Sequence, residues 1–130
     1  MSWFKTPETL LEEYKQSKRQ WLNQERDRLI HGGLVFDGNH YQTRPEDITN
    51  VMGAVQVAQL AAAAGQDFQT KWLTSDNQEI PMSLVELAGL GVALAEHKEQ
   101  LIYKCREHKQ ALDALESIDA VDNYLEDLSW

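Results

Sequence analysis

The longest uninterrupted helical pattern in the sequence runs from Leu84 to about Glu116, with no helix breaker inside it. At about 1.5 Å per residue, such a helix would reach about 50 Å. Ser83 and Glu86 match the Ser-x-x-Glu capping box at its start. One line of residues along it, here called the heptad stripe, follows alternating steps of three and four. It consists of Leu84, Leu87, Gly91, Leu94, Lys98, Leu101, Cys105, His108, Leu112 and Leu115.

The heptad stripe needs an apolar cover along its length. We expect Leu94, Leu101, Leu112 and Leu115 to be buried against another helix, either the N-terminal helix of the same chain or a second copy. The N-terminal helix offers few apolar residues for so long a stripe. We therefore expect self-association through the long helices, as in a coiled coil, and hence a homo-oligomer.

The N-terminal helix is predicted from a capping threonine at Thr6, a proline at the first helical position and Glu8 in the first turn. It should run to about Ile30, where His31–Gly33 ends it. Its apolar residues are sparse: Leu10, Leu11, Tyr14, Trp21, Leu22, Leu29 and Ile30. A thin apolar stripe on a polar helix predicts contact with a partner element along one line.

Two β-hairpins are predicted between the long helices. The first covers residues 34–42 around Asp37-Gly38-Asn39, and the second covers 68–82 around Ser75-Asp76-Asn77. A helix that starts at Pro45 and ends at Gly65 separates them. With a short terminal helix from about Asp119 to Leu125, the sequence predicts a mainly α fold with small antiparallel β-hairpins, an α+β class.

We expect two regions along the chain, an N-terminal helical attachment segment at 1–31 and a domain at 32–130. Residues 1–31 hold six Lys/Arg against five Asp/Glu, whereas residues 32–130 hold six against sixteen. From Gln110 to Trp130 there are six acids and no Lys or Arg, a stretch that is either a solvated end or a docking patch for a basic partner. Such a charge repels phosphate backbones, so we expect no nucleic-acid binding.

The remaining composition points to a soluble protein made in a cytoplasm. Cys105 stands alone, which excludes an internal disulfide. The N-terminus lacks the basic start and apolar run of a signal peptide, and the most apolar stretch, Leu84 to Ala95, is too short to span a bilayer. We expect no membrane association.

Searches for chemistry find no catalytic or cofactor site. Cys105 and His108 share one helical face, but two ligands do not make a metal site. No Gly-x-Ser-x-Gly elbow is present, and Cys105 lies mid-helix rather than at a helix N-terminus. Gly89 and Gly91 fall inside a helix, so they are expected to permit close contact between helices rather than to cradle phosphates. We expect no metal, no cofactor and no enzyme activity.

Interaction is the function class that remains. Trp3, Phe4 and Trp130 lie near the chain ends, where aromatic residues either anchor a partner or cap their own core. The residues expected to make interactions come from the N-terminal helix and from the heptad stripe. They are Trp3, Phe4, Leu10, Leu11, Tyr14, Trp21, Leu94, Leu101, Leu112 and Leu115.

The segment from about Arg26 to Leu125 resembles a domain of unknown function that recurs in bacteriophage and prophage proteins, commonly encoded beside tail-fibre genes. The resemblance rests on residues 33–38 before 48–54, on Ala61–Ala64 before 72–77, and on the Leu/Gly/Ala pattern of the long helix. Residues 72–77, Trp-Leu-Thr-Ser-Asp-Asn, followed by that helix, are its most specific part. The resemblance implies a structural or assembly module, without catalytic residues to carry over. The helix from Thr6 to about Arg26 lies outside it.

Together these observations predict a non-enzymatic structural or interaction protein of a phage tail, baseplate or tail-fibre attachment, located in the virion tail after synthesis in the host cytoplasm. The alternative is a tail-fibre assembly chaperone that is absent from the mature virion. A small enzyme is the third class, and the searches above do not favour it. Sequence alone does not separate the first two.

Overall fold

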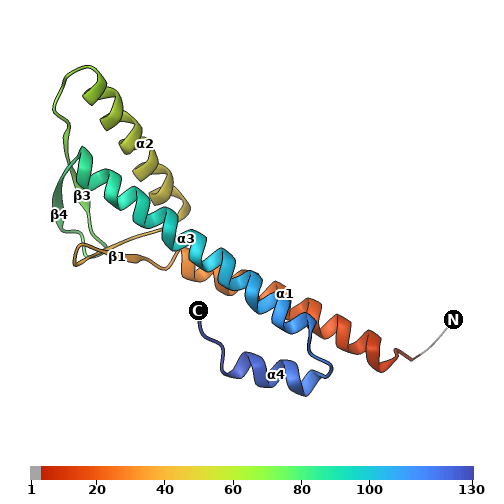
Figure 1. Ribbon diagram of the computed structural model, residues 1–130. Coiled ribbons are helices and arrows are strands. Elements are labelled where there is room, and N and C mark those ends of the chain that lie inside the picture. The colour runs from red at the N-terminus through yellow and green to blue at the C-terminus, as the bar shows by residue number, and fades with distance from the viewer. Residues whose placement is uncertain (1–3) are drawn as a thin grey trace. The chain divides into compact units, whose positions relative to one another are not determined.

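The structure is a computed structural model that describes residues 4–130. The described residues are 65% helical and form four helices and two antiparallel two-stranded sheets. In chain order the elements are α1 (Pro7–Ile30), β1 (Leu34–Phe36), β2 (Asn39–Tyr41), α2 (Pro45–Ala63), β3 (Gln69–Leu73), β4 (Glu79–Ser83), α3 (Leu84–Asp113) and α4 (Ile118–Glu126) (Figure 1). The predicted class, mainly α with two small β-hairpins, is confirmed.

The chain divides into two compact units. Unit 1 comprises the chain up to Asp27 together with Leu101–Trp130, and unit 2 comprises Arg28–Gln100. α1 and α3 therefore each contribute to both units. The division expected from the sequence, at residues 31 and 32, follows chain order, whereas the compact units pair the start of the chain with its end.

The two hairpins of unit 2 form where turn residues take left-handed backbone conformations. Asp37 and Gly38 have φ of 49° and 79°, as a tight two-residue turn requires, and they pair Leu34 with Tyr41 at the far end of the hairpin. In the second hairpin the residue with positive φ is Asn77, at 65°. The Ser75 amide donates to the His40 carbonyl at 2.8 Å, which joins the two hairpins.

The core of unit 2 lies between α2, the first half of α3 and the hairpins. Its fully buried members include Val51, Ala58, Leu87 and Leu90, and Leu94 belongs to the same cluster. Figure 1 shows α2 beside the start of α3, with β3 and β4 close to the same end.

The two glycines of α3 serve different contacts. A Cβ at Gly91 would meet the side chains of Val51, Met52 and Val55 of α2 at 3.5–3.9 Å, so this glycine lies where two helices approach, as predicted. A Cβ at Gly89 would lie 3.1 Å from the ring of Phe36. That glycine therefore admits a hairpin side chain, which corrects the expectation that both glycines serve helix packing.

Helix ends in unit 2 are held by side-chain and backbone hydrogen bonds. After α1, Thr43 accepts from the Gly33 amide at 2.8 Å and donates to the Ile30 carbonyl at 2.6 Å, although Thr43 is fully buried. After α2, Gly65 has φ of 74°, and the Gln66 amide donates to the Ala61 carbonyl at 2.9 Å. This is the glycine-terminated helix end predicted from the sequence.

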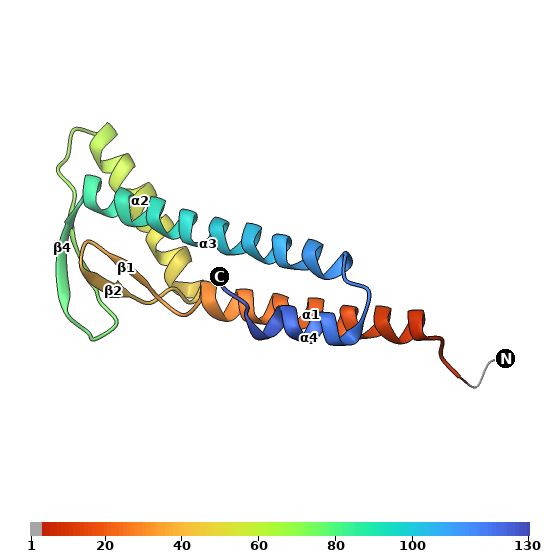
Figure 2. The same cartoon turned by 60° about the horizontal axis from the view of Figure 1, so that its bottom comes forward.

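Unit 1 consists of the first part of α1, the last part of α3 and α4. The Cys105 thiol lies against the Leu22 carbonyl at 3.6 Å, and Lys15 reaches the Asp113 carbonyl at 3.1 Å, so α1 and α3 run antiparallel here. α4 runs back along α1 (Figure 2). The Tyr14 hydroxyl of α1 donates a hydrogen bond to the Asp122 carboxylate of α4. The buried centre is formed by Leu22, Cys105, Leu112 and Val121.

Candidate cleft for a partner protein

Three of the four predicted interaction residues of the heptad stripe belong to, or pack against, the chain's own cores. Leu94 belongs to the core of unit 2 and Leu112 to that of unit 1, while Leu115 packs against the unit 1 core and Leu101 is half-buried. In unit 1 the covering side chains come from α1 and α4. Within one chain the stripe in unit 1 is therefore already covered, because α4 supplies apolar residues that the N-terminal helix lacks.

The contacts of Lys15 explain how α1 can cover the stripe although α1 has few apolar residues. The Lys15 side chain is buried, and its ammonium group donates to the last turn of α3 at the Asp113 carbonyl. Carbonyls at a helix C-terminus have no partner in the helix and favour a cation. Arg19 binds the Asp113 carboxylate as well, with its Nη2 at 2.5 Å. Two charged residues from the polar surface expected for α1, Lys15 and Arg19, therefore join α1 to α3.

The aromatic residue at the end of the chain packs against its own core. The Trp130 ring lies edge-on to the His108 ring, with centroids 5.0 Å apart. His108 is buried, and its Nε2 must donate to the Ser129 carbonyl at 2.8 Å, because a carbonyl only accepts. The other ring nitrogen meets the Tyr124 hydroxyl at 2.7 Å. Of the two roles left open for Trp130, capping its own core is the one observed.

The same contacts bear on the Cys105 and His108 pair. Both ring nitrogens of His108 have hydrogen-bond partners, and the Cys105 thiol is buried against the Leu22 carbonyl. Within residues 4–130, no group of three or more His, Cys, Asp or Glu side chains lies where it could hold a metal ion. Both side chains are thus buried and hydrogen-bonded within unit 1.

The predicted interaction residues of α1 divide into two sets. Leu11 and Tyr14 are half-buried against the core of unit 1, and a hydrogen bond to the Asp122 carboxylate raises the pKa of the Tyr14 phenol. Phe4, Leu10 and Trp21 are exposed, at 85%, 46% and 38%. Trp3 lies outside the described residues.

Three of these residues lie at or near a cleft at one end of unit 1, here called the α1–α4 cleft. It has a volume of about 390 Å³ and is lined by the first turns of α1 and α4 and the segment that leads into α4. The lining residues are Pro7, Glu8, Leu10, Leu11, Glu116, Ser117, Ile118 and Asp119. Phe4 precedes α1 by three residues, at the same end of that helix.

Capping hydrogen bonds fix the first turns of the two helices that line the cleft. Thr6 accepts from the Thr9 amide at 3.1 Å, and Pro7 occupies the first helical position, where no amide is needed. Ser117 accepts from the Ala120 amide, also at 3.1 Å, and so fixes the first turn of α4. The cleft is thus built on two capped helix starts and the short segment that leads into α4.

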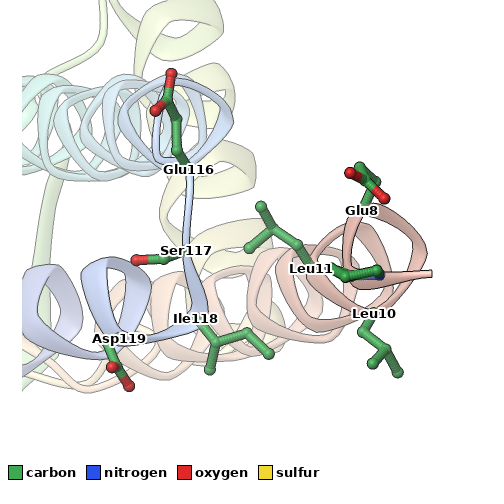
Figure 3. Close-up of a pocket in the computed structure, with 8 residues that line it drawn as sticks. Glu8, Leu10, Leu11, Glu116, Ser117, Ile118 and Asp119 are labelled. Carbon is green, nitrogen blue, oxygen red and sulfur yellow. The ribbon is translucent and has the colours of Figure 1, made fainter. Parts of the chain in front are cut away.

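The cleft combines an apolar floor with an acidic rim. Figure 3 shows Leu11 directed toward the segment between α3 and α4 and Ile118 directed toward α1, while the carboxylates of Glu116 and Asp119 point away from the floor. None of the eight lining residues is basic. Such a surface can hold an aliphatic or aromatic side chain and attract a cation beside it.

Sequence reasoning named Leu10 and Leu11 but missed Ile118, which is 39% exposed. No local pattern links Ile118 to Leu10, because the two residues are far apart in the sequence. They line the same cleft only after α4 folds back. The acidic run after Gln110 was noticed, and Glu116 and Asp119 belong to it.

Unit 2 has a second, polar cleft of about 380 Å³ beside Arg44, Lys71 and Trp72. Its cations are already paired. Arg44 binds Asp47 at 2.7 Å, and Lys71 binds Glu79 at 3.2 Å. This cleft therefore offers no free cation to a ligand, and the α1–α4 cleft is the stronger candidate.

An exposed apolar surface that the sequence reading did not single out lies on α2. The helix carries no charged residue after Asp47, and the exposed fractions of Val57 and Leu60 are 55% and 71%. Isolated exposed aliphatic residues are common, but two of them on the uncharged part of one helix make a surface suited to a neutral partner.

Comparison with known proteins places the chain in a family. No curated protein and no solved structure matches it. Among the described helices, none has the length and apolar character needed to cross a membrane. The family model described as Domain of unknown function (DUF4376) matches residues 13–126, which include most of α1 and so correct the expectation that the resemblance begins near Arg26. The chain belongs to this family of domains of unknown function.

Proposed function

We propose that the protein is a non-enzymatic interaction protein of a bacteriophage tail, which attaches to a tail-fibre or baseplate protein through the α1–α4 cleft. The observation that carries the docking role is the exposure of Leu10 and Ile118 around an open cleft on two capped helices. Burial of each such side chain by a partner would contribute about 1 to 2 kcal/mol, since part of each is already covered.

The tail location is supported by the sequence resemblance to phage and prophage proteins described above. A resident tail component and an assembly chaperone both need an exposed apolar contact. We favour the resident component because the cleft is fixed by helix caps and by a packed core, so a partner would meet a surface that is already ordered. The chaperone is the alternative outcome of the same experiment.

The experiment is mass spectrometry of gradient-purified phage particles, beside an infection in which the gene is disrupted. We expect the protein in particles at a fixed copy number that matches the three-fold or six-fold symmetry of the tail. Its absence from particles, together with misassembled fibres in the disrupted infection, would make it a chaperone. Its absence with normal particles would contradict both roles.

The contribution of the cleft is tested by complementing the disrupted gene with Ile118→Ser. The matched control is Ile102→Ser, because the two isoleucines are 39% and 41% exposed and both lie in unit 1, but Ile102 does not line the cleft. We expect the first variant to lose incorporation into particles and the control to keep it. Equal incorporation would contradict docking at the cleft.

We also propose that copies of the chain associate through α2 rather than through the heptad stripe. A chain with a net charge of −9 repels its copies over most of its surface, whereas α2 is uncharged after Asp47 and exposes Val57 and Leu60. Leu60→Glu should reduce the mass in sedimentation to that of one chain. A wild-type protein that is already monomeric at micromolar concentration would contradict this proposal.

A further inference from the structure

We infer that the α1–α4 cleft takes a segment of the partner protein in which an apolar side chain is flanked by Lys or Arg. This inference rests on the docking role proposed above and goes beyond it by assigning the chemistry of the partner. It is carried by the arrangement of charge around the apolar floor.

Three carboxylates border the cleft. Glu8 lies in the first turn of α1, Asp119 in the first turn of α4, and Glu116 in the segment before α4. The two helix starts each add about half a positive charge, so the three carboxylates outweigh them by about two charges. The field at the cleft is therefore negative, and it favours a cationic segment over a neutral or anionic one.

The acidic surface continues along α4. Asp122 and Glu126 are exposed on that helix, and Asp127 follows its last turn. Asp122 accepts the hydrogen bond from Tyr14, whose hydroxyl is neutral, so its charge is not cancelled. A partner segment longer than the cleft would thus meet further carboxylates on α4.

The N-terminal region of a second copy is a poor occupant, because its basic groups already have partners. Lys5 binds Glu13 at 2.7 Å, and Arg26 binds Asp27 at 2.9 Å. Lys15 and Arg19 are held at the end of α3, and the Lys18 ammonium lies 5.1 Å from the ring centroid of Tyr14. A copy would have to break these contacts to place a cation at the cleft.

The inference can be tested with a synthetic helical probe and the intact chain. The probe is an amphipathic peptide of leucine and lysine, and its counterpart has glutamate at every lysine position. Binding of each labelled peptide is followed by fluorescence anisotropy at low and at about 0.3 M salt, since salt screens exposed charges. We expect the lysine peptide to bind at low salt and to bind more weakly at about 0.3 M salt. We expect no binding of the glutamate peptide.

The deciding comparison removes the same number of charges at two places. The cleft variant carries Glu8→Gln, Glu116→Gln and Asp119→Asn. The control carries three neutralised acids that are exposed on unit 2 and belong neither to the cleft nor to α4: Asp67→Asn, Glu96→Gln and Glu99→Gln. We expect the cleft variant to lose about tenfold or more in affinity and the control less than about threefold. Equal losses would overturn the inference, because attraction would then be a property of net charge alone.

Two further measurements keep the result clear. Circular dichroism melting checks that the cleft variant folds, and Glu116→Gln alone, which alters a residue outside the helices, should still weaken binding. Sedimentation of both triple variants shows whether they change the mass of the protein. A change confined to the cleft variant would make a second copy the occupant and overturn the basic-partner assignment.

Particle incorporation separates this inference from the proposed function. If Ile118→Ser abolishes incorporation and the cleft charge variant is incorporated normally, docking at the cleft stands and the basic chemistry of the partner is wrong. If both variants are incorporated like the wild type, docking at the cleft itself is wrong. If both lose incorporation and the two control variants keep it, the inference is supported.

Discussion

Replacement of Leu112 by alanine tests whether the heptad stripe is covered within the chain. Leu112 is fully buried in unit 1, in a cluster with Leu22, Cys105 and Val121 from α1, α3 and α4. Truncation of a fully buried leucine to alanine costs about 3 kcal/mol, because it loses transfer free energy and leaves a cavity. Against a total stability of about 5 to 15 kcal/mol, that is a large fraction.

The assay is urea unfolding at several protein concentrations, followed by far-ultraviolet circular dichroism. Leu10→Ala is the matched control, since Leu10 is a leucine of the same unit that is 46% exposed, and we expect it to cost less than about 1 kcal/mol. Trp21 and Trp130 report on unit 1, whereas Trp72 belongs to unit 2, so fluorescence of single-tryptophan variants assigns the loss to one unit. We expect the loss in unit 1.

Two results would refute this reasoning. If Leu112→Ala and Leu10→Ala cost the same, then Leu112 is not in a closed core. If the midpoint of the unit 1 transition rises with protein concentration and Leu112→Ala abolishes that dependence, then a second copy completes the cover of the stripe.

Three further predictions follow from individual contacts. His108→Ala should cost about 2 to 3 kcal/mol and shift the fluorescence of Trp130 to longer wavelength, because the buried ring that Trp130 packs against and its bonds to Tyr124 and Ser129 are lost; unchanged emission would contradict this. The Arg44 guanidinium lowers the pKa of Asp47 below its ordinary value of about 3.9, so the pair stabilises the fold above that pH and the benefit disappears as the pH falls through the lowered pKa. Asp47→Asn should therefore cost up to about 1 kcal/mol near neutral pH in thermal melts, a difference that should vanish near pH 2, and a gap that persists there would refute the pairing. Thiol reagents should modify Cys105 only after unfolding, and chelators should leave the melting temperature unchanged, whereas stoichiometric zinc or iron in protein purified without added metal would contradict the packing role of Cys105 and His108.

The helices and hairpins could be predicted from the sequence because local residues determine them. Thr6-Pro7 starts α1, Asp37-Gly38 makes the first turn, and Gly65 ends α2, each through the backbone conformation or hydrogen bond expected of it. Ser83 at the start of α3 accepts from the Glu86 amide at 3.4 Å, as the capping pattern indicated. None of these features depends on the tertiary structure.

The cover of the heptad stripe could not be predicted in the same way. Counting apolar residues left out Lys15, whose ammonium group binds the Asp113 carbonyl at the end of α3 while its buried stem packs between helices. The apolar residues that were missing from the count come from α4 and from Trp130. The return of a short terminal helix could be expected, but no local pattern shows which surface it covers.

The structure also narrows the set of residues through which a partner could bind. Of the ten residues expected to interact, Leu94, Leu112 and Leu115 pack in the chain's own cores, Leu101 is half-buried, and Leu11 and Tyr14 pack partly against unit 1. Trp21 is exposed but does not line the cleft. Leu10 remains, with Phe4 at the same end of α1 and Ile118 across the cleft.

The small set of remaining exposed residues changes how the N-terminal helix is expected to attach to a partner. A helix that binds along its length would need a free apolar stripe, and α1 has already placed Leu22 in the core and Lys15 against α3. The first turns of α1 keep Leu10 exposed and border a cleft with an acidic rim, whereas Trp21 is exposed farther along the helix and away from the cleft. Attachment is therefore expected at the α1–α4 cleft, where the burial of one apolar side chain from a basic segment of the partner suffices. Attachment along a groove is not expected, because α1 would then have to leave the core of unit 1.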